Sequence, residues 1–148
     1  MKTNLHHVSL FTNDLERSLV LFKDLLGFKE IWSVGPVGGK GMASLFGLDD
    51  MKARLVMLKS KAGFLLELIL LMDPPLEASQ GPPALPSPAA LALEVEDLDG
   101  LHQSLVQQGW APFTPVTQMP TPDGGMVRMF CIRTDENVLL EFLEAPLS

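Results

Sequence analysis

Two histidines near the start of the sequence and two glutamates in similar apolar runs could act as catalytic groups or metal ligands. Glu67 lies in the apolar run LLELIL, and Glu141 lies in the similar run LLEFLE. His6 and His7 stand together near the start of the stretch LHHVSLFTNDLERSLVLFKDLLGF. A carboxylate among apolar neighbours is costly to bury unless it is paired, protonated or bound to a metal ion. Glu67 is therefore the first candidate for a functional group.

The histidine pair belongs to a predicted strand from Leu5 to Thr12. Alternate side chains of a strand share one face, so His7, Ser9 and Phe11 are expected to point to the same side. Since Glu67 also lies in a predicted strand, the two strands could present an imidazole and a carboxylate on one face of a sheet.

The remaining segments predict a chain of two similar halves. A helix with capping-box spacing at Asn13 and closed by Gly27 follows the first strand. The first half continues with a strand at 28–34, a mobile loop at 35–41, a helical turn at 43–48 and a β-hairpin at 54–59 and 64–71. Six prolines between 73 and 88 exclude regular structure and predict a linker. The second half predicts a strand at 90–95, a helix from 97 to 109, strands at 110–116, 127–133 and 138–143, and a tight turn at 122–125.

The two halves resemble copies of one module. An offset of 83 residues places His7 on Ala90, and an offset of 74 residues places Glu67 on Glu141. Both matches occur in the same order on either side of the proline-rich linker, which favours a duplication. The second copy therefore keeps the glutamate but has alanine in place of the histidine.

This repeat predicts an α+β fold in which two paired βαβββ modules form a curved mixed sheet around a cup. We expect the first module at 1–72, the linker at 73–88 and the second module at 89–148, within one compact domain. One face of each module packs under its helix, and the other face lines the cup. An apolar surface with a few polar groups is typical of small-molecule sites. The expected lining comprises His7, Ser9, Phe11, Leu65, Glu67, Ile69, Ala90, Ala92, Glu94, Leu139, Glu141 and Leu143.

The composition excludes several classes of protein. The net charge of −7 argues against a nucleic-acid partner, since phosphate binding requires a basic surface. The longest apolar run is too short to span a membrane, and the N-terminus lacks the apolar core of a signal peptide. The single cysteine, Cys131, excludes an intramolecular disulfide and favours a reducing compartment. We expect a soluble cytoplasmic protein.

The opening stretch HHVSLFTNDLERSLVLFKDLLGF and the runs LLELIL and LLEFLE resemble the vicinal oxygen chelate superfamily. Its members include glyoxalase I, methylmalonyl-CoA epimerase, extradiol dioxygenases and bleomycin-resistance proteins. The resemblance covers nearly the whole chain outside the linker. It implies paired βαβββ modules around a cup, a homodimer in many members, and a divalent metal ion in the catalytic members.

The resemblance also implies which positions would hold a metal. In metal-binding members the ligands come from the first and last strand of each module, which here gives His7, Glu67, Ala90 and Glu141. Alanine cannot bind a metal, so three donors remain for a divalent ion such as Ni, Zn, Mn, Co or Fe. Such an ion would hold two vicinal oxygens of a substrate, while Glu67 or Glu141 carries a proton. The implied chemistry is that of a glyoxalase-type lyase or isomerase.

Ala90 keeps a second function open. Ring-cleaving dioxygenases of this superfamily use two histidines and one carboxylate on iron, so alanine at this position disfavours a dioxygenase. Ala90 and Ala92 also enlarge the cup, as expected for drug-sequestering members that lack a metal. In that alternative the acidic lining, which includes Glu94, would attract a cationic or hydrogen-bonding ligand. A metal-dependent enzyme and a metal-free binding or drug-resistance protein both agree with the sequence.

Four further residues have less specific interpretations. Strand alternation places His6 opposite His7, and His102 is expected on the surface of the second helix. Cys131 lies in a predicted strand and is interpreted as a packing residue. Arg128 either pairs with a carboxylate of the ligand or is an ordinary arginine on the rim of the cup.

Overall fold

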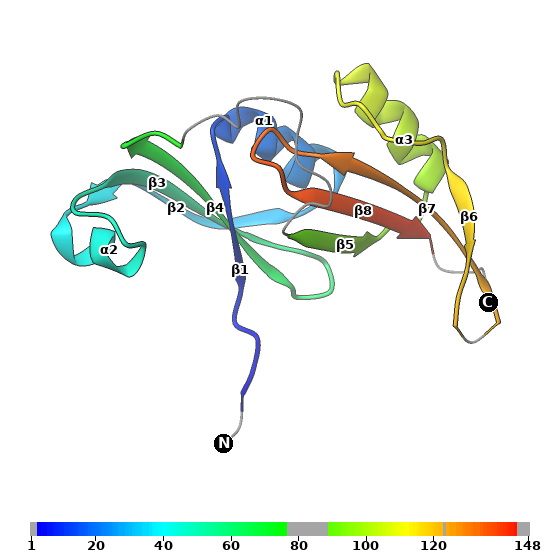
Figure 1. Ribbon diagram of the computed structural model, residues 1–148, viewed down its shortest axis with the longest axis horizontal. Coiled ribbons are helices and arrows are strands. Elements are labelled where there is room, and N and C mark those ends of the chain that lie inside the picture. Colours follow the sequence, from blue (N-terminus) through cyan, green and yellow to red (C-terminus); the bar gives the residue numbers. More distant parts are fainter. Residues whose placement is uncertain (1–2, 77–88, 123, 145–148) are drawn as a thin grey trace. The chain divides into compact units, whose positions relative to one another are not determined.

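The computed structural model describes residues 3–76, 89–122 and 124–144, which belong to two compact units. Unit 1 spans Met1–Ala78 and unit 2 spans Ser79–Ser148. Each unit contains one four-stranded mixed sheet with its helices (Figure 1). The predicted α+β class and the repeated order of strands and helices are confirmed, and unit 1 has one additional short helix.

Unit 1 is a sheet whose first and last strands lie side by side. It comprises β1 (Val8–Thr12), α1 (Leu15–Leu19), a π-helical segment η1 (Val20–Leu25), β2 (Lys29–Gly38), α2 (Lys40–Leu45), β3 (Lys52–Lys59) and β4 (Leu65–Asp73). The strand order is β1-β4-β3-β2, in which β1 runs parallel to β4 and the other pairs are antiparallel. This order puts the strand after His7 directly next to the strand that carries Glu67.

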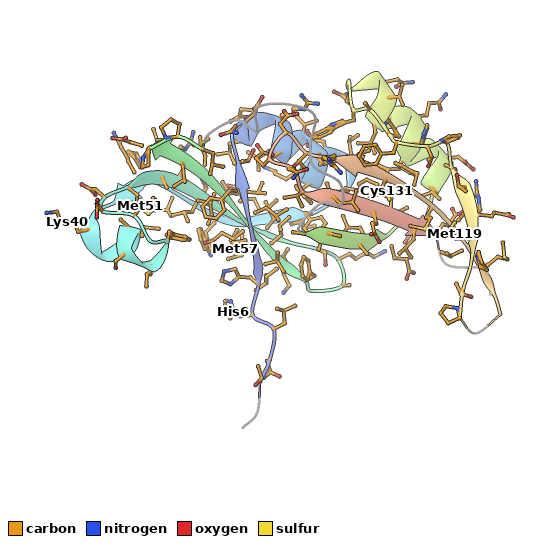
Figure 2. All side chains as sticks on the ribbon, viewed as in Figure 1. His6, Lys40, Met51, Met57, Met119 and Cys131 are labelled. Atoms are coloured by element: carbon orange, nitrogen blue, oxygen red, sulfur yellow. The ribbon has the colours of Figure 1, made fainter. Side chains whose placement is uncertain are left out.

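Unit 1 buries apolar side chains on both faces of its sheet. Leu66 and Leu68 of β4 are buried on the face that α1 contacts. The opposite face is partly covered by α2, and Met51 lies beside this helix (Figure 2). This second cluster of buried residues consists of Ala43, Met51, Ala53, Leu55, Ile69 and Leu71. The face of the sheet that carries Glu67 is therefore covered by packed apolar side chains at its α2 end.

Unit 2 repeats the same topology with a single helix. It comprises β5 (Ala90–Glu94), α3 (Leu98–Gln107), β6 (Thr117–Pro120), β7 (Met126–Arg133) and β8 (Leu139–Glu144). The strand order is β5-β8-β7-β6, and β5 runs parallel to β8. The helix α3 packs on one face of this sheet (Figure 1). Both the helix and the strands β7 and β8 contribute buried apolar residues. These buried residues are Leu98, Leu101, Leu105, Phe130, Ile132, Leu140 and Phe142.

Both principal helices begin at an aspartate and are followed by a glycine. The Asp14 carboxylate accepts a hydrogen bond from the backbone three residues on (3.0 Å), and the Asp97 carboxylate does the same (2.9 Å). The capping position predicted at Asn13 is wrong by one residue, because β1 is followed by one connecting residue before the cap. Gly27 and Gly109 adopt positive φ angles of 69° and 81°, which other residues rarely adopt.

The mobile loop predicted at 35–41 is also wrong. β2 continues to Gly38, and α2 begins at Lys40. The strand accommodates Pro36 because β2 is the edge of the sheet and its register shifts between Val34 and Val37. Gly38 is required here, since a Cβ atom would overlap the carbonyl of Met51.

In unit 2 the strand predicted at 110–116 is wrong, and the edge strand is β6 instead. Pro112 and Pro115 lack the N–H groups that regular pairing needs. The backbone of this segment meets β7 through an isolated hydrogen bond from Phe113 N to Cys131 O (3.0 Å).

The predicted linker, 73–88, lies mostly outside the described residues, and so does residue 123 of the predicted turn at 122–125. Asp73, its first residue, is the end of β4. Within the described residues, no helix is both long and apolar enough to cross a membrane.

Candidate functional site

Glu67 is the third residue of β4, and its carboxylate accepts a hydrogen bond from a serine. The strand register places Ser9 of β1 on one side of Glu67 and Met57 of β3 on the other. The Ser9 hydroxyl donates a hydrogen bond of 2.7 Å to Glu67 Oε2. The Glu67 side chain is only 14% exposed, so this bond fixes the direction of a largely buried acceptor.

His7 supplies a second donor atom beside this carboxylate. It directly precedes β1, and its Nε2 atom lies 3.6 Å from Glu67 Oε2. This separation is too long for a direct hydrogen bond. The His7 side chain is 32% exposed, so the pair is accessible from solvent. The structure thus brings together His7 and Glu67, as the sequence predicted for unit 1.

Strand alternation predicted that His6 and His7 point in opposite directions, but in the structure their rings are in contact. The Nδ1 atom of His6 is 2.6 Å from Nδ1 of His7, and the two rings meet edge to face. Alternation fails because the regular strand begins only at Val8, and His6 lies on the stretch before it (Figure 2). One ring must donate and the other accept, so His6 influences which nitrogen of His7 carries a proton. When His7 donates from Nδ1, its Nε2 is left with a free lone pair that faces Glu67.

The distance between the two donors agrees with a shared metal ion. Two atoms that each lie about 2.1 Å from an ion and 3.6 Å from each other subtend about 120° at the ion, which suits a divalent metal. An imidazole and a carboxylate also form a suitable donor pair for Mn, Fe, Co, Ni or Zn. Across the described residues, however, no group of three or more His, Cys, Asp or Glu side chains could hold a metal. Unit 1 thus provides two of the predicted donors.

In unit 2, Glu141 occupies the position that Glu67 has in unit 1. The register places Ala92 of β5 on one side of Glu141 and Cys131 of β7 on the other. Ala92 stands where unit 1 has Ser9, so the hydroxyl that holds Glu67 has no counterpart here. Burial raises the pKa of the Cys131 thiol, and the Glu141 carboxylate raises it further.

The predicted lining residues of unit 2 lie on an open face of the sheet. Leu140 and Phe142 of β8 are fully buried, whereas the residues that alternate with them are half-buried. On β5, the predicted residues are exposed. This open face contains Ala90, Ala92, Glu94, Leu139, Glu141 and Leu143.

Two predicted lining residues of unit 1 belong to its hydrophobic core instead. Ile69 is fully buried in the cluster under α2, and Phe11 packs against that cluster and contacts Phe46 edge to face. The sequence did not indicate that α2 would cover this face. Leu65 is half-buried at the start of β4.

Arg128 is already paired with two carboxylates of unit 2. Its guanidinium donates to Glu144 Oε2 (2.7 Å) and to Asp99 Oδ2 (2.5 Å), and these bonds join β7 to β8 and to the first turn of α3. The hydrogen bond to Asp99 is the main cause that raises the pKa of Arg128. Arg128 shares the helix-facing side of β7 with Phe130, so it is not on the face that carries Glu141.

A different arginine, Arg133, was missed by the sequence analysis. Its Nε, Nη1 and Nη2 atoms are buried and have no hydrogen-bonding partner among the described residues. Its guanidinium carbon lies 5.2 Å from the centre of the Phe113 ring. Alternation along β7 would have placed Arg133 on the same face as Cys131 and Glu141, and the observed register agrees.

A family model identifies the family of this chain, and solved structures share its fold. The profile of the Glyoxalase/Bleomycin resistance protein/Dioxygenase superfamily matches residues 4–142. No curated protein sequence matches the chain. Among solved structures, a glyoxalase family protein from Bacillus cereus is 20% identical with a TM-score of 0.75, covering 97% of this chain and 95% of that chain.

Two further structures share the fold. A glyoxylase/bleomycin resistance protein/dioxygenase domain from Frankia sp. EAN1pec is 22% identical with a TM-score of 0.64, covering 99% of this chain and 100% of that chain. The fosfomycin resistance protein FosX from Listeria monocytogenes, complexed with Mn(II) and sulfate, is 17% identical with a TM-score of 0.61, covering 99% of this chain and 96% of that chain. The matched residues span both units, their repeated topology and both glutamate strands. The chain therefore belongs to the Glyoxalase/Bleomycin resistance protein/Dioxygenase superfamily.

Proposed function

We propose that this protein binds a small molecule with the help of a divalent metal ion and catalyses a lyase or isomerase reaction. The observation that carries the proposal is the pair of donor atoms in unit 1, His7 Nε2 and Glu67 Oε2, 3.6 Å apart. A similar fold, that of FosX, has been solved with Mn(II) bound, which supports a divalent ion in this fold. Glu141 enters the proposal as a further ligand only through the sequence repeat and the family resemblance.

Each residue of unit 1 has a distinct role in this proposal. His7 and Glu67 hold the ion, which when bound would polarise the oxygens of a substrate as a Lewis acid. Ser9 orients the Glu67 carboxylate through its 2.7 Å hydrogen bond. In this proposal Nδ1–H of His7 donates a hydrogen bond to Nδ1 of His6, which leaves Nε2 of His7 free to bind the ion.

A glutamate is also the proposed proton carrier. Proton transfer next to a polarised carbonyl requires a basic group within hydrogen-bonding reach of the substrate. Glu67 and Glu141 are each the third residue of the last strand of their unit, and both are only partly exposed. A carboxylate that is not needed as a ligand can accept and return the proton.

A metal-free binding or drug-resistance protein is the second candidate. It is favoured by the lack of a three-donor group among the described residues and by the exposed alanines of β5. Ala90 and Ala92 leave space on the open face of unit 2 beside Leu139 and Leu143, where an organic ligand could pack directly. Such a protein would bind its ligand equally well after treatment with a chelator.

A homodimer and a cytoplasmic location complete the proposal. Ile31, Trp32 and Val34 are exposed on β2, an edge strand, and exposed apolar edges favour pairing with another chain.

The single cysteine favours a reducing compartment, as argued from the sequence.

Metal analysis of the untagged protein tests the leading candidate. The protein is purified without chelator, incubated in turn with Mn, Ni, Co and Zn, separated from free ion and analysed by mass spectrometry. We expect bound metal in the wild type and loss of it in His7→Ala. His102→Ala is the matched control, because His102 lies on α3 of unit 2 and packs against Phe130 of β7.

The outcomes separate the two candidates. Absence of metal in the wild type after all four incubations would exclude the metal-dependent enzyme. A rise in melting temperature with organic ligands in the presence of a chelator would then support the metal-free protein. Equal metal content in wild type and His7→Ala would contradict the proposed ligand set.

A further inference from the structure

The guanidinium of Arg133 is a buried charge that lacks a hydrogen-bonding partner in the described part of the chain. Arginine stays protonated at all physiological pH values, so the charge cannot be relieved by losing a proton. Its three nitrogens are buried, and none of them donates a hydrogen bond. Nearly all buried polar groups in folded proteins are hydrogen-bonded, so each exception needs an explanation.

The contact with Phe113 compensates for only part of this cost. A cation over an aromatic ring is stabilised only modestly, whereas burying an ion without a partner is strongly unfavourable. The ring also satisfies no N–H group. A hydrogen bond from Phe113 N to Cys131 O (3.0 Å) keeps Phe113 beside β7, where its ring lies 5.2 Å from the guanidinium carbon and leaves the N–H groups of Arg133 without an acceptor among the described residues.

The surroundings of Arg133 resemble a subsite for one end of a ligand. Arg133 is opposite Leu139 in the register and shares a face with Cys131 and Glu141. Leu139 is half-buried and the Phe113 ring is 52% exposed, so apolar surface adjoins the charged group. Arg128, five residues earlier, shows the contrasting case of an arginine whose carboxylate partners belong to the protein.

We infer that Arg133 binds an oxyanion of the ligand, such as a carboxylate or a phosphate group, whose apolar part packs against Phe113 and Leu139. The planar fork of a guanidinium matches two oxygens of such a group through paired, charge-assisted hydrogen bonds. The inference rests on the proposed small-molecule function but requires no metal. It gives the ligand a negative group, where the acidic lining alone suggested a cationic ligand.

Thermal unfolding of the full chain in different anions tests this inference. Melting temperatures are measured at constant ionic strength in chloride, inorganic phosphate and propionate, for wild type, Arg133→Met, Arg133→Lys and Arg54→Met. Arg54 is an exposed arginine on β3, so Arg54→Met controls for the loss of one positive charge. Phosphate and propionate distinguish the two kinds of oxyanion.

We expect phosphate or propionate to raise the melting temperature of the wild type and of Arg54→Met relative to chloride. Arg133→Met should abolish that rise, and Arg133→Lys should reduce it by weakening anion affinity about 10- to 100-fold. In chloride, Arg133→Met should melt no lower than the wild type, because the substitution removes an unpaired buried charge.

Two results would overturn the inference. A lower melting temperature of Arg133→Met in chloride would show that the protein itself supplies the acceptor, since breaking a buried pair is strongly destabilising. Equal responses of wild type and Arg133→Met to both anions, including no response at all, would exclude an oxyanion site at Arg133. Metal binding by His7 is measured separately, so its failure and the failure of the oxyanion site are distinguishable.

Discussion

At the scale of single residues, the two glutamates occupy equivalent positions but have different neighbours. Glu67 accepts a hydrogen bond from Ser9 and faces His7, whereas Glu141 lies between Ala92 and Cys131. A carboxylate that is held in one direction binds a metal better than one that must be oriented on binding. The donor pair of unit 1 is therefore the stronger candidate for holding the ion.

Replacing Ser9 by alanine should weaken metal binding without removing a ligand. Loss of an outer-shell hydrogen bond to a ligating group lowers metal affinity by about 10- to 100-fold. We expect the dissociation constant for Mn²⁺ or Ni²⁺, measured by calorimetric titration of Ser9→Ala, to rise by about tenfold. Ser44→Ala is the control, because the Ser44 hydroxyl donates to Gly41 O in α2. An unchanged dissociation constant would show that Ser9 does not orient a metal ligand.

At the scale of elements, the sequence repeat is visible in how each helix begins. Asp14 and Asp97 both accept a hydrogen bond from the first turn of their helices. The offset between them is the same 83 residues that relates His7 to Ala90. The sequence predicted where both helices begin to within one residue, because a cap depends on residues within one helical turn, although it placed the first cap at Asn13 rather than Asp14. The strand limits of β2 and β6 were not predicted, because they depend on pairing with distant strands.

The cap of α3 gives a prediction of stability. Asp97→Ala should lower the free energy of unfolding by about 1 kcal/mol, because the first turn loses an acceptor for a backbone N–H group. Asp97→Asn should retain most of the stability, since asparagine is an equally good cap. Unfolding in urea followed by circular dichroism measures both variants. A cost in Asp97→Asn equal to that in Asp97→Ala would indicate that the charge matters more than the cap.

At the scale of the whole molecule, the chain belongs to a superfamily whose fold is built from repeated modules. The second module kept the glutamate and the strand register but has alanines in place of both Ser9 and His7. Unit 1 therefore carries a donor pair, and unit 2 carries an open face of apolar residues with two glutamates, Glu94 and Glu141. This difference agrees with the proposal that His7 and Glu67 of unit 1 are the metal ligands.

Restoring the missing histidine tests this account of the repeat. In Ala90→His, the new imidazole should lie beside Glu141 as His7 lies beside Glu67, because β5 and β8 pair as β1 and β4 do. We expect the affinity of the protein for Ni²⁺ or Zn²⁺ to increase about tenfold, or about 1.4 kcal/mol, in a competition titration. Ala90→Gln is the control of similar size without an imidazole. No gain over Ala90→Gln would show that the second module no longer provides a metal position.

The sequence by itself determined the family, the α+β class, the repeated order of elements and the nearness of His7 to Glu67. The family came from the resemblance of the opening stretch and the two glutamate runs to a known superfamily. The other features follow from local periodicity and from a duplicated motif, which do not depend on long-range packing. Only the tertiary structure showed that α2 covers Ile69, that His6 meets His7, and that Arg128 is paired while Arg133 has no hydrogen-bonding partner among the described residues. The partner of a charged side chain is set by whichever residue lies across the sheet, and strand pairing joins residues that are far apart in the sequence.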